Sequence, residues 1–191
     1  RASRARLYVM ILGIAGSFGS GKGTVVEYLS NTLGFKHYSA SGFITEEIRR
    51  RGMPVNRDSM IVVANDLRKQ HGPAYIIETL YERAQAEGGK AIIEALRAVA
   101  EVRKIKELGG HVIGVNADPE IRYERAFARG SEKDNVSFEE FLEHERLESN
   151  PDDPTKQNVF GALEEADIHI DNNGTLEELH AKINEALAKL T

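Results

Sequence analysis

A glycine-rich stretch that contains one lysine is the part of this chain whose residue types and spacing predict chemistry most directly. It follows an apolar run, Leu7 to Ile14, that predicts a buried strand, and it precedes a segment with helical spacing of apolar residues. Glycines let the backbone curl until several N–H groups point at one anion, and the helix N-terminus adds partial positive charge. This context predicts a phosphate-binding loop for a nucleoside triphosphate. The residues expected to bind the nucleotide are Gly16, Ser17, Phe18, Gly19, Ser20, Gly21, Lys22, Gly23 and Thr24.

Two side chains of this loop carry its specific chemistry. Lys22 is expected to reach the outer phosphates and to be catalytic. Gly23 stands where the commonest form of the motif has Ser or Thr, so the hydroxyl expected to serve Mg²⁺ comes one position later, at Thr24. The alternative, a glycine-rich turn that binds nothing, leaves unexplained why the loop, the lysine and the flanking periodicities agree.

Two charged residues close a later predicted strand that lies within residues 90–96. A carboxylate at Glu94 is expected to hold Mg²⁺ through water, and the Arg97 guanidinium to bind a phosphate of the substrate. The alternative is a simple ion pair. We favour substrate binding because charges seldom stand at the end of a buried strand without a partner.

Three arginines recur after the next predicted strand, 111–116. Arg122, Arg125 and Arg129 are spaced by three and four residues and can share one helix face. Arginines aimed at a moving phosphoryl group lower the barrier to its transfer. The row leads into Gly130 and a charged segment, a pattern typical of a hinged lid. Arg125 and Arg129 are therefore expected to be catalytic, with a weaker case for Arg122; the alternative is a solvated helix face.

A further group of arginines follows the second predicted strand, 35–39. One or two of them are expected to hold the phosphate of a second substrate, and the remainder to be surface residues. Arg49 and Arg57 are the candidates, together with Ser41 at the strand end. The six histidines show no metal-ligand spacing.

Composition bounds the class of protein. The chain has 191 residues, which fits one domain, and its hydrophobic content of 41% fits a globular protein. A net charge of −5 gives no sign of a nucleic-acid or membrane partner. The absence of cysteine excludes thiol chemistry and fits a cytoplasmic location. Residues 1–6 are interpreted as a short basic leader rather than a signal peptide.

Five predicted strands alternate with helices, which implies a parallel sheet covered on both faces, an α/β fold. The strands are expected at 7–14, 35–39, 91–93, 111–116 and 167–170. Two of the helices expected between these strands run from Phe43 to Arg51 and from Pro73 onward. Ligands of such sheets bind beyond the carboxyl ends of the strands, where the polar residues named above gather.

Taken together, these residues resemble the nucleoside monophosphate kinase branch of P-loop proteins, over about residues 11–187. The loop is similar to the adenylate kinase signature, with Phe18 where that family has Pro. Adenylate-kinase-like proteins often labelled dephospho-coenzyme A kinase-like share Leu-Arg-x-x-x-Gly at 67–72 and Asn-Gly-Thr-Leu-Glu-Glu near the end. They end a strand with Asp-Gly-Ile-Arg, where this chain has Glu94, Ala95, Leu96 and Arg97.

The resemblance implies a P-loop NTPase fold, a three-layer α/β/α sandwich whose five-stranded sheet has the order 2-3-1-4-5, in one domain spanning residues 1–191. It implies ATP and Mg²⁺ as cofactors, acceptor-binding helices at about 40–85, and a small mobile lid at about 126–160. The expected reaction transfers the γ-phosphate of ATP to a small-molecule acceptor, a nucleoside or deoxynucleoside monophosphate, by a monomer or homodimer. Two alternatives stay open: a dephospho-coenzyme A kinase, and a nucleotide-binding switch without turnover.

Overall fold

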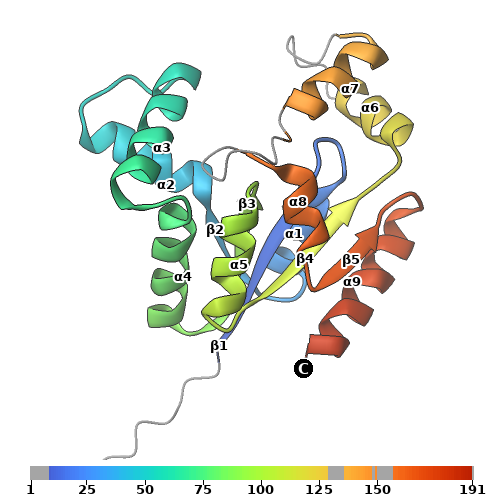
Figure 1. Cartoon of the computed structure of the whole chain (residues 1–191). Coiled ribbons are helices and arrows are strands. Elements are labelled where there is room, and N and C mark those ends of the chain that lie inside the picture. Colours follow the sequence, from blue (N-terminus) through green and yellow to red (C-terminus); the bar gives the residue numbers. More distant parts are fainter. Residues whose placement is uncertain (1–8, 129–135, 148, 150–156, 191) are drawn as a thin grey trace, which may run out of the picture.

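A single parallel sheet forms the centre of the molecule (Figure 1). The computed structural model describes residues 9–128, 136–147, 149 and 157–190. Within them the strand order is β2-β3-β1-β4-β5, with every neighbouring pair parallel. This confirms the predicted fold class and order. The strands are β1 (Val9–Gly16), β2 (Lys36–Ser39), β3 (Gly89–Leu96), β4 (His111–Asn116) and β5 (Ile168–Asp171).

Helices cover both faces of the sheet. Leu12 and Ile14 of the central strand point into a core built with α1 and α9, whereas Ile11 and Ala15 point into a second core built with α2, α3, α4, α5 and α8. A strand buried on both faces reads as a continuous apolar run, as β1 does. The helices are α1 (Lys22–Asn31), α2 (Ala40–Arg50), α3 (Arg57–His71), α4 (Tyr75–Glu87), α5 (Val99–Glu107), α6 (Pro119–Ala128), α7 (Phe138–Leu147), α8 (Val159–Glu164) and α9 (Leu176–Leu190).

Two pairs of helices flank the edge of the sheet at which the strands end. In Figure 1, α2 and α3 rise at the upper left, and α6 and α7 at the upper right. Because all strands are parallel, their carboxyl ends meet at this one edge, where ligands bind in open α/β sheets. The fold therefore places the glycine-rich loop, which follows β1, between the two helical pairs.

Two helix starts differ from the sequence prediction. Helix α2 begins at Ala40 rather than Phe43, because the Ser39 hydroxyl accepts the Gly42 N–H at 3.2 Å and caps the helix. Helix α4 begins at Tyr75, so Pro73 lies in the turn before it instead of opening it. The first difference moves Ser41 from a strand end into the first turn of α2.

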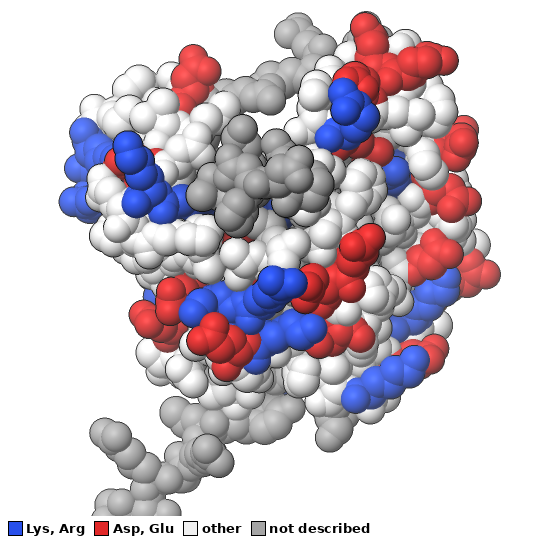
Figure 2. Space-filling view, viewed as in Figure 1, with Lys and Arg blue, Asp and Glu red and all other residues white. Residues whose placement is uncertain are grey.

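Charges of both signs are mixed on the surface. On the face shown in Figure 2, basic and acidic side chains alternate, with no extended basic area. Exposed pairs such as Arg103 with Glu165 join α5 to the end of α8. Among the described residues, no helix has the length and apolar character needed to cross a bilayer.

Candidate functional site: a phosphate-binding loop and its surroundings

The loop between β1 and α1 has the backbone geometry of an anion cradle. Gly19 and Gly21 have φ angles of 76° and 92°, a region that L side chains disfavour. Lys22, the first residue of α1, folds back so that its ammonium group donates to the Ser17 carbonyl at 2.7 Å. The ammonium group of Lys22 therefore lies over the loop, and its expected contact with the outer phosphates stays a prediction.

Contacts from neighbouring elements hold the loop from outside. The Ser17 hydroxyl donates to Oδ1 of Asn116, at the end of β4 (2.7 Å). The side-chain amide of Asn172, directly after β5, donates to the Ser20 carbonyl (2.9 Å). Ser17, Ser20 and Asn172 are all buried. A Cβ on Gly21 would stand 2.3 Å from the Asn172 amide nitrogen. Side chains after two strands thus fix the cradle before any ligand arrives, which lowers the cost of binding.

The inner side of the loop opens on a cavity of about 370 Å³. It lies between the loop, α6 and the turn from β5 to α9. Thr24 and Arg125 both line it, and a Cβ on Gly23 would meet no atom within 4 Å. The full lining comprises Gly21, Thr24, Arg125, Ala128, Asn172, Gly174, Thr175, Leu176 and Leu179. This size suits a nucleotide-scale ligand.

Arg125 is the residue of this cavity that most clearly calls for a ligand. Its Nη1 atom is buried and has no hydrogen-bond partner among the described residues. It lies 4.0 Å from the position of a Cβ on Gly21, beside the phosphate loop. A buried guanidinium nitrogen without a partner is costly unless an anion satisfies it. The residues present therefore fit a nucleoside triphosphate.

The other two arginines of the predicted row are placed differently. Arg122 is 2% exposed and does not line the 370 Å³ cavity. It donates to the Ala117 carbonyl at 2.8 Å and forms an ion pair with Glu145 of α7. It therefore braces α6 and α7 against each other. Arg129 lies outside the described residues.

The end of β3 carries an irregularity beside the loop. Pairing with β1 shifts register between Ile14 and Ala15, leaving Ala95 as an extra residue with a φ of 73°. A bulge of this kind re-aims neighbouring side chains and is common next to active sites. Where the sequence resembled Asp-Gly-Ile-Arg, alanine occupies the position at which glycine is free of strain.

Glu94, just before the bulge, has a partner that the sequence analysis missed. His37 Nε2 lies 2.6 Å from Glu94 Oε2 across β2 and β3. Ser39 is the register partner of Glu94, and His37 is two residues earlier on the same face of β2. Once the two strands were known to be neighbours, this alternation would have been the signal.

The arginines on α2 divide into paired and unpaired groups. Arg50 and Arg51 both bind Glu47, and Arg51 also binds Asp66 of α3 at 2.6 Å. Arg49 is exposed and forms no ion pair within the part of the chain that is described. Arg49 is thus the arginine of this run without an ion pair among the described residues, and its contact with a substrate phosphate stays a prediction. Of the other candidates, Arg57 begins α3, Ser41 is exposed, and Arg97 is exposed after β3.

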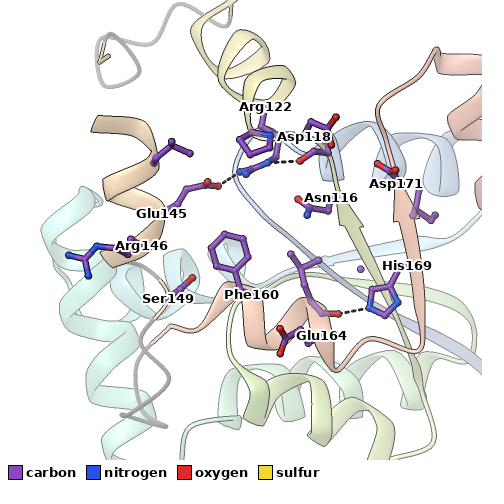
Figure 3. Close-up of a pocket in the computed structure, with 16 residues that line it drawn as sticks. Asn116, Asp118, Arg122, Glu145, Arg146, Ser149, Phe160, Glu164, His169 and Asp171 are labelled. Atoms are coloured by element: carbon purple, nitrogen blue, oxygen red, sulfur yellow. Dashed lines mark hydrogen bonds and ion pairs between the residues drawn. The ribbon is translucent and has the colours of Figure 1, made fainter. Parts of the chain in front are cut away.

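A larger cavity of about 790 Å³ lies on the α8 side of β4 and β5, and it shares no lining residue with the 370 Å³ cavity. Figure 3 shows Phe160 and Glu145 beside it, with the Arg122–Glu145 pair at its upper edge. The glycine-rich loop contributes no residue to its lining. No motif in the sequence indicated this cavity.

Among the described residues, no cluster of three or more acidic or histidine side chains could hold a metal ion by itself. Mg²⁺ in phosphate-transfer sites is commonly held by one or two protein groups, water and the substrate phosphates. Thr24 lines the cavity beside the loop and Glu94 is paired with His37, so the Mg²⁺ site expected at these two residues stays a prediction.

The parallel sheet and the glycine-rich loop after its central strand define a P-loop protein. Residues 15–141 match the AAA domain family. The chain is 30% identical to a UPF0200 protein of Hyperthermus butylicus over 187 residues, 95% of each chain. It therefore belongs to the UPF0200 family.

Two solved structures show the same fold. The TT1252 protein of Thermus thermophilus matches with a TM-score of 0.63 and 21% identity, over 96% of this chain and 99% of that one. A gluconokinase of Sinorhizobium meliloti 1021 matches with a TM-score of 0.54 and 15% identity, over 97% and 94%. This chain thus shares its fold with a gluconokinase.

Proposed function

We propose that this protein is a kinase that transfers the γ-phosphate of ATP to a nucleoside or deoxynucleoside monophosphate. The observation that carries the proposal is the buried Nη1 of Arg125, which has no hydrogen-bond partner among the described residues; Arg125 lines the same cavity as Gly21 and Thr24. In phosphoryl transfer the protein mainly positions the reactants and neutralises charge, and cations already fixed at the site do this most effectively.

The donor side of the reaction uses the loop and α6. The loop N–H groups and Lys22 bind the donor phosphates, and Arg125 stabilises the charge on the moving group. Arg129 is proposed to join it when a lid at about 126–160 closes. Mg²⁺ would supply charge neutralisation between the phosphates, held through water by Thr24 and Glu94.

The acceptor side uses α2, α3 and the end of β3. The exposed guanidinium groups of Arg49 and Arg97 are proposed to bind the acceptor phosphate, together with Arg57 and the first turn of α2 at Ser41. The two helical pairs of Figure 1 then hold one substrate each, on opposite sides of the loop.

A second candidate is a kinase with a hydroxyl acceptor, such as dephospho-coenzyme A. Such an acceptor needs a general base, and Glu94, held 2.6 Å from His37, is a carboxylate at the strand ends that fits this role. The similarity of the fold to a gluconokinase agrees with this candidate.

A coupled assay of ADP release tests both candidates. The enzyme would be supplied with ATP and Mg²⁺ and offered all ribo- and deoxyribonucleoside monophosphates and dephospho-coenzyme A. Lys22→Met should abolish the turnover of the wild-type protein, while Lys182→Met, which removes an exposed lysine on α9, should leave it intact. Turnover with a monophosphate supports the proposal, and turnover with dephospho-coenzyme A alone replaces it with the second candidate.

The assay can also show no turnover with any acceptor. If ATP raises the melting temperature of the wild-type protein but not of Lys22→Met, and no acceptor is phosphorylated, the kinase proposal fails and a nucleotide-binding switch explains the loop better. If ATP does not bind at all, the assignment of residues 16–24 is wrong.

A further inference from the structure

A buried carboxylate at the start of α5 is not used by the proposed chemistry. Glu101 is 3% exposed. Its Oε2 atom accepts the N–H groups of Arg97 at 2.8 Å and Ala98 at 3.2 Å. These contacts close the turn from β3 into α5, as in a capping box. Burial raises the pKa of Glu101, and the two N–H groups and the charge of Arg68 oppose that rise.

The cation that faces this carboxylate comes from a different part of the fold. Arg68 near the end of α3 places Nη2 3.7 Å from Glu101 Oε1. A buried carboxylate is strongly destabilising unless a positive charge compensates it. Helix α3 in turn is tied to α2 by the ion pair of Arg51 with Asp66. The electrostatic environment of Glu101 therefore depends on where the α2–α3 pair lies.

Both backbone polar groups of Arg97 are hydrogen-bonded. Glu101 binds its N–H, and its carbonyl accepts the N–H of Asn158, which caps α8, at 2.8 Å. The Arg97 side chain itself is exposed. A long, exposed guanidinium on a fixed backbone searches a limited volume, which favours binding of a phosphate at one defined place.

We infer that Glu101 is a positioning residue that couples the α2–α3 pair to the backbone of Arg97. Binding of the acceptor phosphate against α2 and α3 holds Arg68 on Glu101, and Glu101 in turn holds Arg97 toward the same phosphate. This inference rests on the proposed function, because it gives the two arginine-bearing elements one common substrate.

Three variants test the coupling by steady-state kinetics. Glu101→Gln keeps an oxygen for the two N–H groups but removes the charge, and Arg68→Met removes the cation from a half-buried position. Each should raise the KM for the acceptor by about tenfold, within the usual range of coupling between sites, and change the KM for ATP by less than about twofold. Arg68→Lys should recover part of the loss. Glu165→Gln is the control. It breaks the ion pair of Glu165, after α8, with Arg103, which lies on α5 like Glu101, and it should leave both KM values unchanged.

The double variant decides between coupling and simple loss of stability. If Arg68 and Glu101 act as one unit, Glu101→Gln/Arg68→Met should raise the acceptor KM no further than either single change. Additive effects, equal changes in both KM values, or a lowered melting temperature with unchanged KM values would each overturn the inference.

Hydrogen exchange keeps the test separate from the proposed function. Arg68→Met should speed exchange of the amide hydrogens of Arg97 and Ala98, while amides of β4 keep their rates. If the wild-type protein phosphorylates no acceptor, the proposed function fails, and the exchange rates still decide whether Arg68 acts on Arg97 through Glu101. Unchanged exchange at both amides would refute the coupling even in an active kinase.

Discussion

The guanidinium of Arg122 on α6 donates a hydrogen bond to the backbone carbonyl of Phe18 in the phosphate loop, with Nη1 and the oxygen 3.4 Å apart. The same nitrogen forms the ion pair with Glu145 of α7. The backbone of Arg122 also touches the loop, because a Cβ on Gly19 would stand only 2.3 Å from its carbonyl oxygen. Helix α6 therefore contacts the loop through Arg122 and lines the 370 Å³ cavity with Arg125.

This close approach makes Gly19 the least replaceable glycine of the loop. In Gly19→Ala the added methyl meets the Arg122 carbonyl at 2.3 Å, and the φ angle of 76° is strained for alanine. We expect a loss of roughly 3 kcal/mol in the free energy of unfolding and loss of ATP binding. Urea unfolding and calorimetric titration with ATP measure the two effects.

Gly23→Ala is the matched control for stability. Its Cβ meets no atom within 4 Å, and the position lies inside α1. Alanine is a better helix former than glycine, so the free energy of unfolding should rise by about 0.5–1 kcal/mol. Equal destabilisation by the two substitutions would show that the contact with Arg122 is not what restricts Gly19.

Replacing Arg125 should lower activity without lowering stability. Arg125→Met removes a buried nitrogen that has no partner among the described residues, so the free energy of unfolding without nucleotide should be unchanged or rise by about 1 kcal/mol. The kcat should fall by at least about 100-fold, because the charge on the moving phosphoryl group loses its guanidinium. Thermal unfolding with and without ATP, together with the ADP-release assay, measures both.

Arg103→Met is the control for that substitution, because Arg103 is exposed on α5 and pairs with Glu165. It should leave the kcat unchanged. A marked loss of stability without nucleotide in Arg125→Met would mean that Arg125 has a structural partner and is not held ready for a phosphate.

Much of the fold was predictable, because periodicity and glycine punctuation mark strands and helices directly. The strand order was implied by the resemblance to known kinases, and the phosphate loop was predicted from the glycines and lysine that follow the first strand. Other features depend on contacts between distant residues. Nothing in the local sequence distinguishes Arg122, which pairs with Glu145 of α7, from Arg125, three residues later, which lines the 370 Å³ cavity. The His37–Glu94 pair likewise exists only because β2 and β3 are neighbours.

Ala95 is predicted to store strain at the end of β3. Its φ of 73° lies in the left-handed region, which costs a non-glycine residue roughly 1–2 kcal/mol. Ala95→Gly removes that cost but adds backbone entropy to the unfolded chain, so we expect a net gain of about 0.5–1 kcal/mol in the free energy of unfolding. For a chain of this size, that gain corresponds to a rise of roughly 1–4 °C in Tm.

Ala91→Gly in the same strand should lower the free energy of unfolding. Ala91 is buried in regular register between Ile11 and Lys36, where glycine weakens a strand and leaves a small cavity. A destabilising effect of Ala95→Gly would argue that the left-handed conformation of Ala95 is not strained in the folded protein.

Acid should weaken the packing of α2 through Glu47. Hydrogen bonds from Arg50 and then Arg51 lower the pKa of Glu47 from 4.5 to about 2. Because the folded-state pKa lies below the unfolded one, the stabilisation is complete above about pH 5 and is lost as the pH falls toward 2. Solvent around the exposed Arg50 screens the pair, so we expect a contribution of about 1 kcal/mol at pH 7.

Glu47→Gln should therefore lower the free energy of unfolding by that amount at pH 7, and the difference from wild type should shrink steadily in urea titrations at pH 5, 4 and 3. Glu82→Gln, an exposed change on α4, should show no such trend. A difference for Glu47→Gln that stays constant with pH would mean that the carboxylate charge contributes nothing to holding α2 in place.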